Sequence, residues 1–186
     1  MTAVTTATSA SYLSPPGGGW TVDDLDRFPD DGLRYELVDG VLLVSAAPSE
    51  EHQIALGNLH LLLAAGCPAD LRVFFAPYDV RLSSRRQLQP DLLVLPKDRS
   101  LSDRRPLLVV EVLSPSTRAV DRTLKRLVFQ DGGIPSYWLV DPFLPSLTVL
   151  ELVDGAYVEV AVVTEDQSYD AATPFPVRVV PADLVR

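Results

Sequence analysis

Short apolar segments, separated by turn signals, make up most of the hydrophobic pattern of this chain. Asp39-Gly40 divides the apolar stretch 33–44, and Asp154-Gly155 divides the stretch 147–163. An Asp-Gly pair between two apolar runs predicts a β-hairpin, because the type I′ turn that joins the strands needs positive φ at both central residues. The pattern therefore predicts two β-hairpins.

Two longer segments have the start and stop signals of α-helices. Residues 49–65 begin with Ser49 as a candidate N-cap, carry acidic residues in the first turn and are followed by Gly66. Residues 116–131 have apolar side chains at helical spacing and are followed by Gly132-Gly133. Both segments are therefore expected to be helices that pack an apolar side against the rest of the protein.

Four further apolar runs indicate β-strands. Residues 71–82 contain Pro77, which suits an edge or a bulge. Residues 107–113 are apolar at nearly every position, which suits a central strand covered on both faces. The shorter runs are 91–95 and 136–141. With the hairpins and helices, they predict an α/β fold in which a mixed central β-sheet is flanked by helices and carries additional β-hairpins.

Length and composition indicate a single domain. The chain has 186 residues, 47% of them hydrophobic, which is enough to build a core. Residues 1–19 are rich in Thr, Ala, Ser, Pro and Gly and predict a flexible tail, so the domain is expected to span residues 20–186, with an irregular piece after residue 163. No apolar run is long enough for a membrane span, and there is one cysteine, so a cytoplasmic protein without disulfides is expected.

The charges are unevenly distributed along the chain. With 25 acidic against 16 basic residues the net charge is −9, which by itself argues against a nucleic-acid partner. Residues 61–130, however, carry 12 basic against 7 acidic side chains, an excess of five positive charges. Such an asymmetry is typical either of a solvated basic face or of a surface for an anionic partner.

Two acidic residues stand out in the predicted strands. Glu111 is the only charged residue in the run 107–113, and a carboxylate in a buried central strand is unfavourable unless something compensates it. Asp91 begins the preceding strand, directly after Pro90. Two carboxylates that met there would repel each other, and a divalent cation with oxygen ligands would remove the repulsion. The alternative is that Asp91 caps a turn while Glu111 pairs with an arginine, and spacing alone does not decide between the two.

Longer motifs surround these two acids. Gln89-Pro90-Asp91 is followed, after a spacer of 19 residues, by Glu111 and the sequence VLSPST, an arrangement that resembles the PD-(D/E)XK nuclease superfamily. More closely, the chain resembles a bacterial family of restriction-endonuclease-like proteins. The matching stretches occur in the family's order and are 35–40, 48–52, 76–82, 89–94, 109–117, 121–125 and 137–142.

The resemblance implies a metal-dependent phosphodiesterase. Asp91 and Glu111 match the two metal-binding acids, the backbone carbonyl of Val112 is a further ligand, and Mg²⁺ is the expected cofactor, with Mn²⁺ as a substitute. Glu36 matches an acid of the family that adds a metal contact, and His52 matches a position suited to orienting water or phosphate. The expected reaction is the in-line attack of a metal-activated water on a DNA phosphodiester.

The lysine of the superfamily is displaced in this chain. It normally lies two residues after the glutamate, where this chain has Leu113. The close family resembles a variant in which the lysine comes from the following helix, and Lys125 occupies that helix. Lys125 is therefore expected to complete the catalytic set with the two acids. The alternative role for Lys125 is a helical ion pair with Asp121, four residues earlier.

The remaining expectations concern partners. DNA is the expected substrate, and a homodimer is expected because cutting two strands suits two-fold symmetry. The alternative on the same fold is a catalytically inactive module that binds nucleic acid or protein. Convergence of Asp91, Glu111 and Lys125 on one cleft would favour the nuclease. The arginines expected to contact the DNA backbone are Arg81, Arg85, Arg86, Arg118, Arg122 and Arg126.

Overall fold

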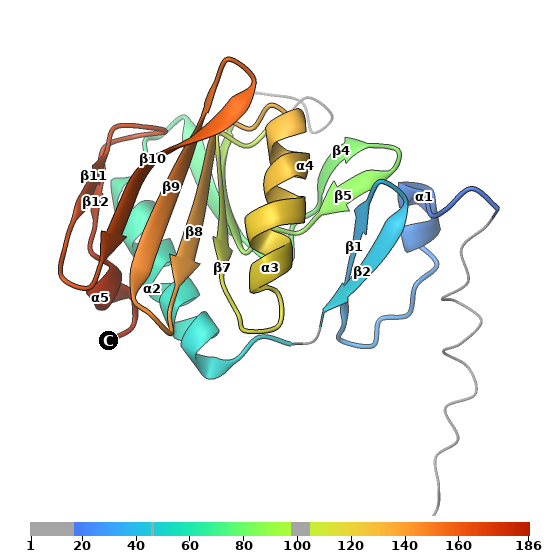
Figure 1. Cartoon of the computed structure of the whole chain (residues 1–186), viewed down its shortest axis with the longest axis horizontal. Coiled ribbons are helices and arrows are strands. Elements are labelled where there is room, and N and C mark those ends of the chain that lie inside the picture. The colour runs from blue at the N-terminus through green and yellow to red at the C-terminus, as the bar shows by residue number, and fades with distance from the viewer. Residues whose placement is uncertain (1–16, 46, 98–104) are drawn as a thin grey trace, which may run out of the picture.

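A six-stranded β-sheet forms the centre of the computed structural model, which describes residues 17–45, 47–97 and 105–186 (Figure 1). Among the described strands of this sheet, β7 and β8 pair in parallel and all other neighbours are antiparallel. The predicted mixed sheet is therefore confirmed, whereas the tail predicted over residues 1–19 lies outside the described residues except for its last three. Across the sheet the strands are β10 (Ala156–Thr164), β9 (Ser146–Val153), β8 (Ser136–Asp141), β7 (Leu108–Val112), β6 (Leu92–Pro96) and β3 (Leu71–Phe75).

Helices cover both faces of this sheet, with α4 (Arg126–Asp131) in front and α2 (Glu50–Gly66) behind in the view of Figure 1. Successive side chains of a strand point to opposite faces, so the two sets of side chains along β7 enter different cores. Leu108, Val110 and Val112 pack in the core that includes α2, and Val109 and Leu113 pack in the core that includes α4. Glu111 therefore lies on the α4 face of the sheet.

Both predicted helices are present, but the second has an unexpected interruption. α2 begins after Ser49, whose side chain accepts a hydrogen bond from the backbone N–H of His52. The second helix consists of α3 (Arg118–Val120), a π-helical turn (Asp121–Lys125) and α4. Such turns are rare inside helices and are frequent at functional sites. No helix in the described ranges combines the length and the apolar character that a membrane span requires.

A second, smaller sheet lies beside the central one, and it overturns one prediction. The single strand predicted over 71–82 is wrong, because β3 ends at Phe75 in the central sheet and the next strand begins at Val80 in the smaller sheet. Pro77 lies between them and has no N–H with which to continue a ladder. The first predicted hairpin is confirmed within this smaller sheet. Its strands, in order, are β2 (Val41–Ser45), β1 (Arg34–Val38), β5 (Arg86–Leu88) and β4 (Val80–Ser83), and α1 (Val22–Leu25) precedes them.

The C-terminal region has more regular structure than predicted. β11 (Tyr169–Ala171) and β12 (Val177–Val179) form a small antiparallel sheet, and α5 (Pro181–Leu184) follows. The prediction of an irregular piece is therefore wrong, because strands of three residues are too short to show an alternating pattern. Phe175 and Leu184 from this region are buried in the core that includes α2.

Gly155, in the second Asp-Gly hairpin turn, provides a test of backbone strain. At Gly155 φ is +81°, and a Cβ built there would meet no atom within 4 Å. Gly155→Ala is therefore expected to lower the free energy of unfolding by about 1–2 kcal/mol through backbone strain alone. Gly57, in the interior of α2, also has no atom within 4 Å of a built Cβ, and Gly57→Ala is expected to raise the free energy by about 0.5–1 kcal/mol. Urea denaturation measures both changes, and changes of the same sign would contradict this account.

Candidate active site

A cavity of about 380 Å³ lies where β7 ends and α2 begins. One side is lined by the end of β2 and the start of α2, and the other by residues 114–117, which connect β7 to α3. Three residues predicted to be catalytic, Asp91, Glu111 and Lys125, all line this cavity. The polar side chains buried at its base are His52, Asp91, Glu111, Asp121 and Lys125, and the half-buried Arg34 joins them.

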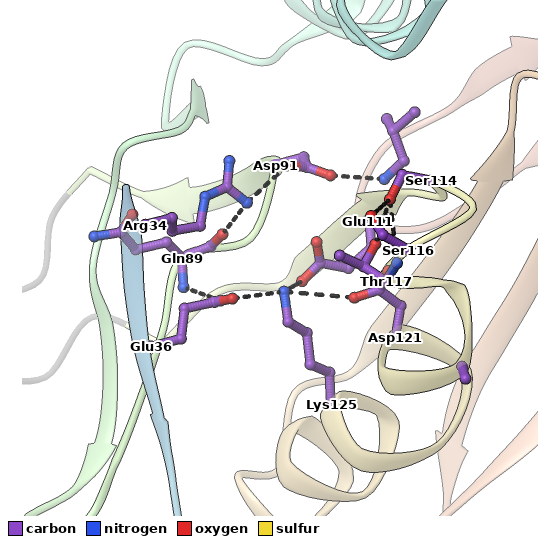
Figure 2. A network of polar contacts seen from close by, with 12 residues as sticks. Arg34, Glu36, Gln89, Asp91, Glu111, Ser114, Ser116, Thr117, Asp121 and Lys125 are labelled. Atoms are coloured by element: carbon purple, nitrogen blue, oxygen red, sulfur yellow. Dashed lines mark hydrogen bonds and ion pairs between the residues drawn. The ribbon is translucent and has the colours of Figure 1, made fainter. Parts of the chain in front are cut away.

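The ammonium group of Lys125 lies among three carboxylates (Figure 2). Its Nζ is 3.1 Å from Glu111 Oε1, 3.1 Å from Glu36 Oε2 and 3.5 Å from Asp121 Oδ1. Lys125 therefore makes the helical pair with Asp121 and also reaches the acids of two strands. The two roles considered for this lysine from the sequence are not exclusive, because the same ammonium group makes both contacts.

Asp91 is held by three groups from distant parts of the chain. Its Oδ1 accepts a hydrogen bond from Arg34 Nη1 at 3.0 Å, and its Oδ2 accepts one from the backbone N–H of Val112 at 2.8 Å and lies 3.0 Å from His52 Nε2. Burial alone would raise the pKa of Asp91, but His52, Arg34 and the Val112 N–H outweigh it and lower the pKa to about 2. Asp91 is therefore an oriented carboxylate that stays charged.

Glu111 has a pKa that is shifted upward, in the opposite direction to that of Asp91. Its burial raises its pKa well above the usual value, the charge of Lys125 opposes this effect, and the neighbouring acids Asp91, Asp121 and Glu36 add to it. For Lys125, burial alone would lower the pKa, but the surrounding carboxylates outweigh burial and raise it. The lysine is therefore charged, and one positive charge does not fully compensate the acids around it.

Local sequence features bring these side chains together. Arg34 and Glu36 are two residues apart on β1 and so point to the same face of the strand. Gln89 links both to Asp91: its backbone N–H donates to Glu36 Oε1 at 2.8 Å, and its carbonyl accepts from Arg34 Nη1 at 3.1 Å. On the other side, the π-helical turn places Asp121 and Lys125 at its two ends, and the hydroxyl of Tyr137 donates to the Asp121 carbonyl at 2.9 Å.

The donor set fits a divalent cation. Four carboxyl groups at this site, those of Glu36, Asp91, Glu111 and Asp121, face the two cationic side chains of Arg34 and Lys125. Carboxylate oxygens are the ligands that Mg²⁺ and Mn²⁺ prefer. In the described ranges, no group of three His, Cys, Asp or Glu side chains is arranged so that it could hold a metal ion. The ammonium of Lys125 lies between three of the carboxylates (Figure 2).

The six arginines predicted to contact DNA lie outside the cavity. Three of them form ion pairs with aspartates, and two donate hydrogen bonds to backbone carbonyls. The ion pairs are Arg81–Asp23, Arg86–Asp39, Arg86–Asp131 and Arg118–Asp141, and the donors to carbonyls are Arg85 and Arg126. Arg122 is the sixth, and it makes no ion pair or hydrogen bond with the part of the chain that the structure describes. Their contacts with DNA stay a prediction.

Two residues of the cluster were not identified from the sequence as site residues. Arg34 precedes the matched glutamate by two residues, and this spacing on a predicted strand was the available signal. Asp121 was considered only as a helical partner of Lys125. Its position in the cavity wall depends on the π-helical turn, which hydrophobic spacing does not reveal.

The mixed sheet, its flanking helices and the buried acid–lysine cluster at the end of β7 define a restriction-endonuclease-like protein. A solved structure described as a putative nuclease belonging to DUF820, from Anabaena variabilis, shares this fold with a TM-score of 0.70 at 18% identity, over 89% of this chain and 97% of that one. The chain belongs to the Uma2 family, described as "Putative restriction endonuclease", whose model matches residues 22–182. No curated protein matches the chain.

Proposed function

We propose that this protein is a Mg²⁺-dependent endonuclease that hydrolyses DNA phosphodiester bonds, with Mn²⁺ able to replace Mg²⁺. The observation that carries the proposal is the convergence of Asp91, Glu111 and Lys125 on one cavity. Membership of a family of nucleases supports the reaction class. The convergence supports a nuclease over a binding module on the same fold, because a module needs no buried carboxylates beside a lysine.

Asp91, Glu111 and the backbone carbonyl of Val112 are the groups proposed to hold the metal. A bound Mg²⁺ supplies a water of lowered pKa and offsets charge on the phosphate. Arg34 and His52 hold the two oxygens of Asp91 in place, as residues around metal ligands commonly do. An ion at this position would compete with Lys125 for the Glu111 carboxylate.

Lys125 is proposed to contact the reacting phosphate. Its long stem carries the ammonium to the base of the cavity, where it already lies beside Glu111 and Glu36. The ammonium carries three N–H donors, and in a metal-loaded site, where Glu111 would also hold the ion, it could donate to a phosphate oxygen. Positive charge placed where negative charge develops stabilises the transition state. The homodimer expected from the sequence stays a prediction.

The direct test is hydrolysis of circular DNA. The purified chain is incubated with circular single-stranded DNA and with supercoiled plasmid, in Mg²⁺, in Mn²⁺ and in EDTA. Conversion of either circle to a linear or nicked form in the metal buffers, and not in EDTA, is the expected result. Binding of DNA without any conversion under these conditions would instead support the inactive binding module.

A repeated sequence in the chain supplies a matched pair of variants. Glu36 and Glu151 each begin an ELVDG motif at a hairpin, but Glu36 contacts Lys125, whereas Glu151 Oε1 accepts a hydrogen bond from Ser136 Oγ at 2.9 Å, away from the cavity. Glu36→Gln is expected to lower the rate of metal-dependent cleavage by about tenfold or more, because it removes a charge next to the metal and the lysine. Glu151→Gln is expected to leave the rate unchanged. Similar initial rates for the two variants would remove Glu36 from the site.

A further inference from the structure

The reactive groups of the site lie at a depth that restricts what can reach them. Glu111 and Asp91 are each 2% exposed, and Lys125 is 4% exposed. A phosphodiester has to enter the cavity to approach them. The cavity holds about 380 Å³ and has walls on both sides, one from β2 and α2 and one from residues 114–117.

An intact duplex fits such a cavity poorly. Duplex DNA is stiff, with a persistence length of about 150 base pairs, and each phosphate is held in line with stacked neighbours and a second strand. Entry of one phosphate between two walls requires local unstacking or unpairing, which is easiest where the strand is already unpaired. A single strand bends freely and can place one phosphate at the base of the cavity.

We propose that the protein acts on an unpaired DNA strand and not on an intact duplex. This inference rests on the proposed nuclease function and specifies the form of its substrate. The unpaired strand includes free single-stranded DNA and the unpaired part of a gapped or frayed duplex, since both present the same flexible backbone to the cavity.

The distribution of cations supports the same conclusion. Binding to duplex DNA relies on several free lysines and arginines that neutralise phosphates along the helix. Five of the six arginines predicted for this purpose are engaged by aspartates or backbone carbonyls, and the whole chain carries a net charge of −9. Of the six arginines predicted to contact DNA, Arg122 is therefore the one whose side chain has no such partner among the described residues.

Arg122 is the cation best placed to guide a strand at the cavity. It follows Asp121 in the π-helical turn, and it is exposed while Asp121 and Lys125 at the ends of the turn are buried. Arg122 also lines a separate groove of about 480 Å³, together with Arg118 and the acidic residues Asp141 and Glu159. A strand that leaves the cavity past this turn therefore meets Arg122.

A binding measurement tests the form of the substrate. A fluorescently labelled oligonucleotide is titrated, alone and annealed to its full complement as a blunt duplex, with the parent chain in EDTA and with the Glu111→Gln chain in Mg²⁺. The single strand is expected to bind at least about tenfold more tightly, because the duplex has to be opened for entry. Equal affinity for the two forms, or a preference for the duplex, would overturn this inference and leave the proposed function standing. Absence of binding to both forms would overturn both.

Two exposed arginines provide the matched variants for the path of the strand. Like that of Arg122, the side chain of Arg72 makes no ion pair or hydrogen bond with the described residues. Arg72 lies opposite Leu95, at the end of β6 that is remote from Asp91. Arg122→Ala is expected to weaken binding of the single strand and to reduce the slope of log K against log salt by about 0.7, the value for one phosphate contact on a single strand. Arg72→Ala is expected to change neither. An unchanged slope in Arg122→Ala would exclude the proposed contact.

Discussion

Replacing Glu111 by glutamine is expected to reduce metal-dependent DNA hydrolysis by about a thousandfold or more. The substitution keeps the shape of the side chain and removes the charge that the proposed metal ion requires. Losing one well-placed electrostatic group at a reacting centre commonly lowers the rate by about 10²–10³, and this glutamate is also expected to hold the ion itself. Initial rates on single-stranded circles, at saturating Mg²⁺, measure the effect.

The same substitution is expected to leave the fold intact. Burial raises the pKa of Glu111, Lys125 opposes this effect and the neighbouring acids add to it, so a neutral side chain is tolerated at this position. Lys125 keeps its contacts with Glu36 and Asp121. Urea denaturation of Glu111→Gln should therefore give a free energy of unfolding close to that of the parent. A variant that is active at the parental rate would contradict the catalytic assignment, and a large loss of stability would contradict the expected intact fold.

Replacing Lys125 by methionine is expected to lower the free energy of unfolding by about 3–5 kcal/mol. The apolar stem is conserved, but Glu36, Glu111 and Asp121 lose the cation that they share, and breaking a buried ion pair from one side leaves uncompensated charge. Mg²⁺ is expected to recover part of this loss, because a ligand that binds only the folded state stabilises it. The increase in urea midpoint with Mg²⁺ should therefore be larger in Lys125→Met than in the parent.

Lys97, the second lysine of the chain, provides the control. Its Nζ donates to the backbone carbonyl of Ala69 at 2.6 Å, on an exposed surface away from the cavity. Lys97→Met is expected to shift the midpoint only slightly and to respond to Mg²⁺ as the parent does. A parental midpoint for Lys125→Met, or an equal response to Mg²⁺ in both variants, would show that Lys125 does not hold the carboxylates together.

The candidate site was predictable from the sequence only where a local pattern or a family motif marks the residue. Glu111 was recognisable because a charge in an apolar run needs compensation, and the family motif supplied Asp91 and Lys125 as its neighbours. Arg34 was not identified, because its partner Asp91 lies 57 residues away, directly before a strand of a different sheet, and no local pattern links the two. The function of a side chain that acts through such a contact becomes visible only when both sheets are assembled.

The fold shows the same limit. The Asp-Gly hairpins and the central strands were predictable because turn chemistry and apolar runs are local properties. The division of residues 71–82 between two sheets was not, because both halves are apolar and only Pro77 marks the break. The short C-terminal strands escaped prediction because their burial comes from packing on α2 and not from a periodic pattern.

The π-helical turn between α3 and α4 determines how the cavity wall would respond to an insertion or a deletion. An α-helix advances by 3.6 residues per turn, and a π-helical turn takes more residues over the same arc. The turn therefore decouples the rotation of Asp121 and Arg118 from that of Val128 and Phe129, which pack in the core. Deleting one residue inside it, such as Thr123, would rewind the segment and swing the residues before it around the helix axis. Insertions and deletions at this point would therefore rotate the residues of the cavity wall about the helix axis and leave the core packing of α4 unchanged.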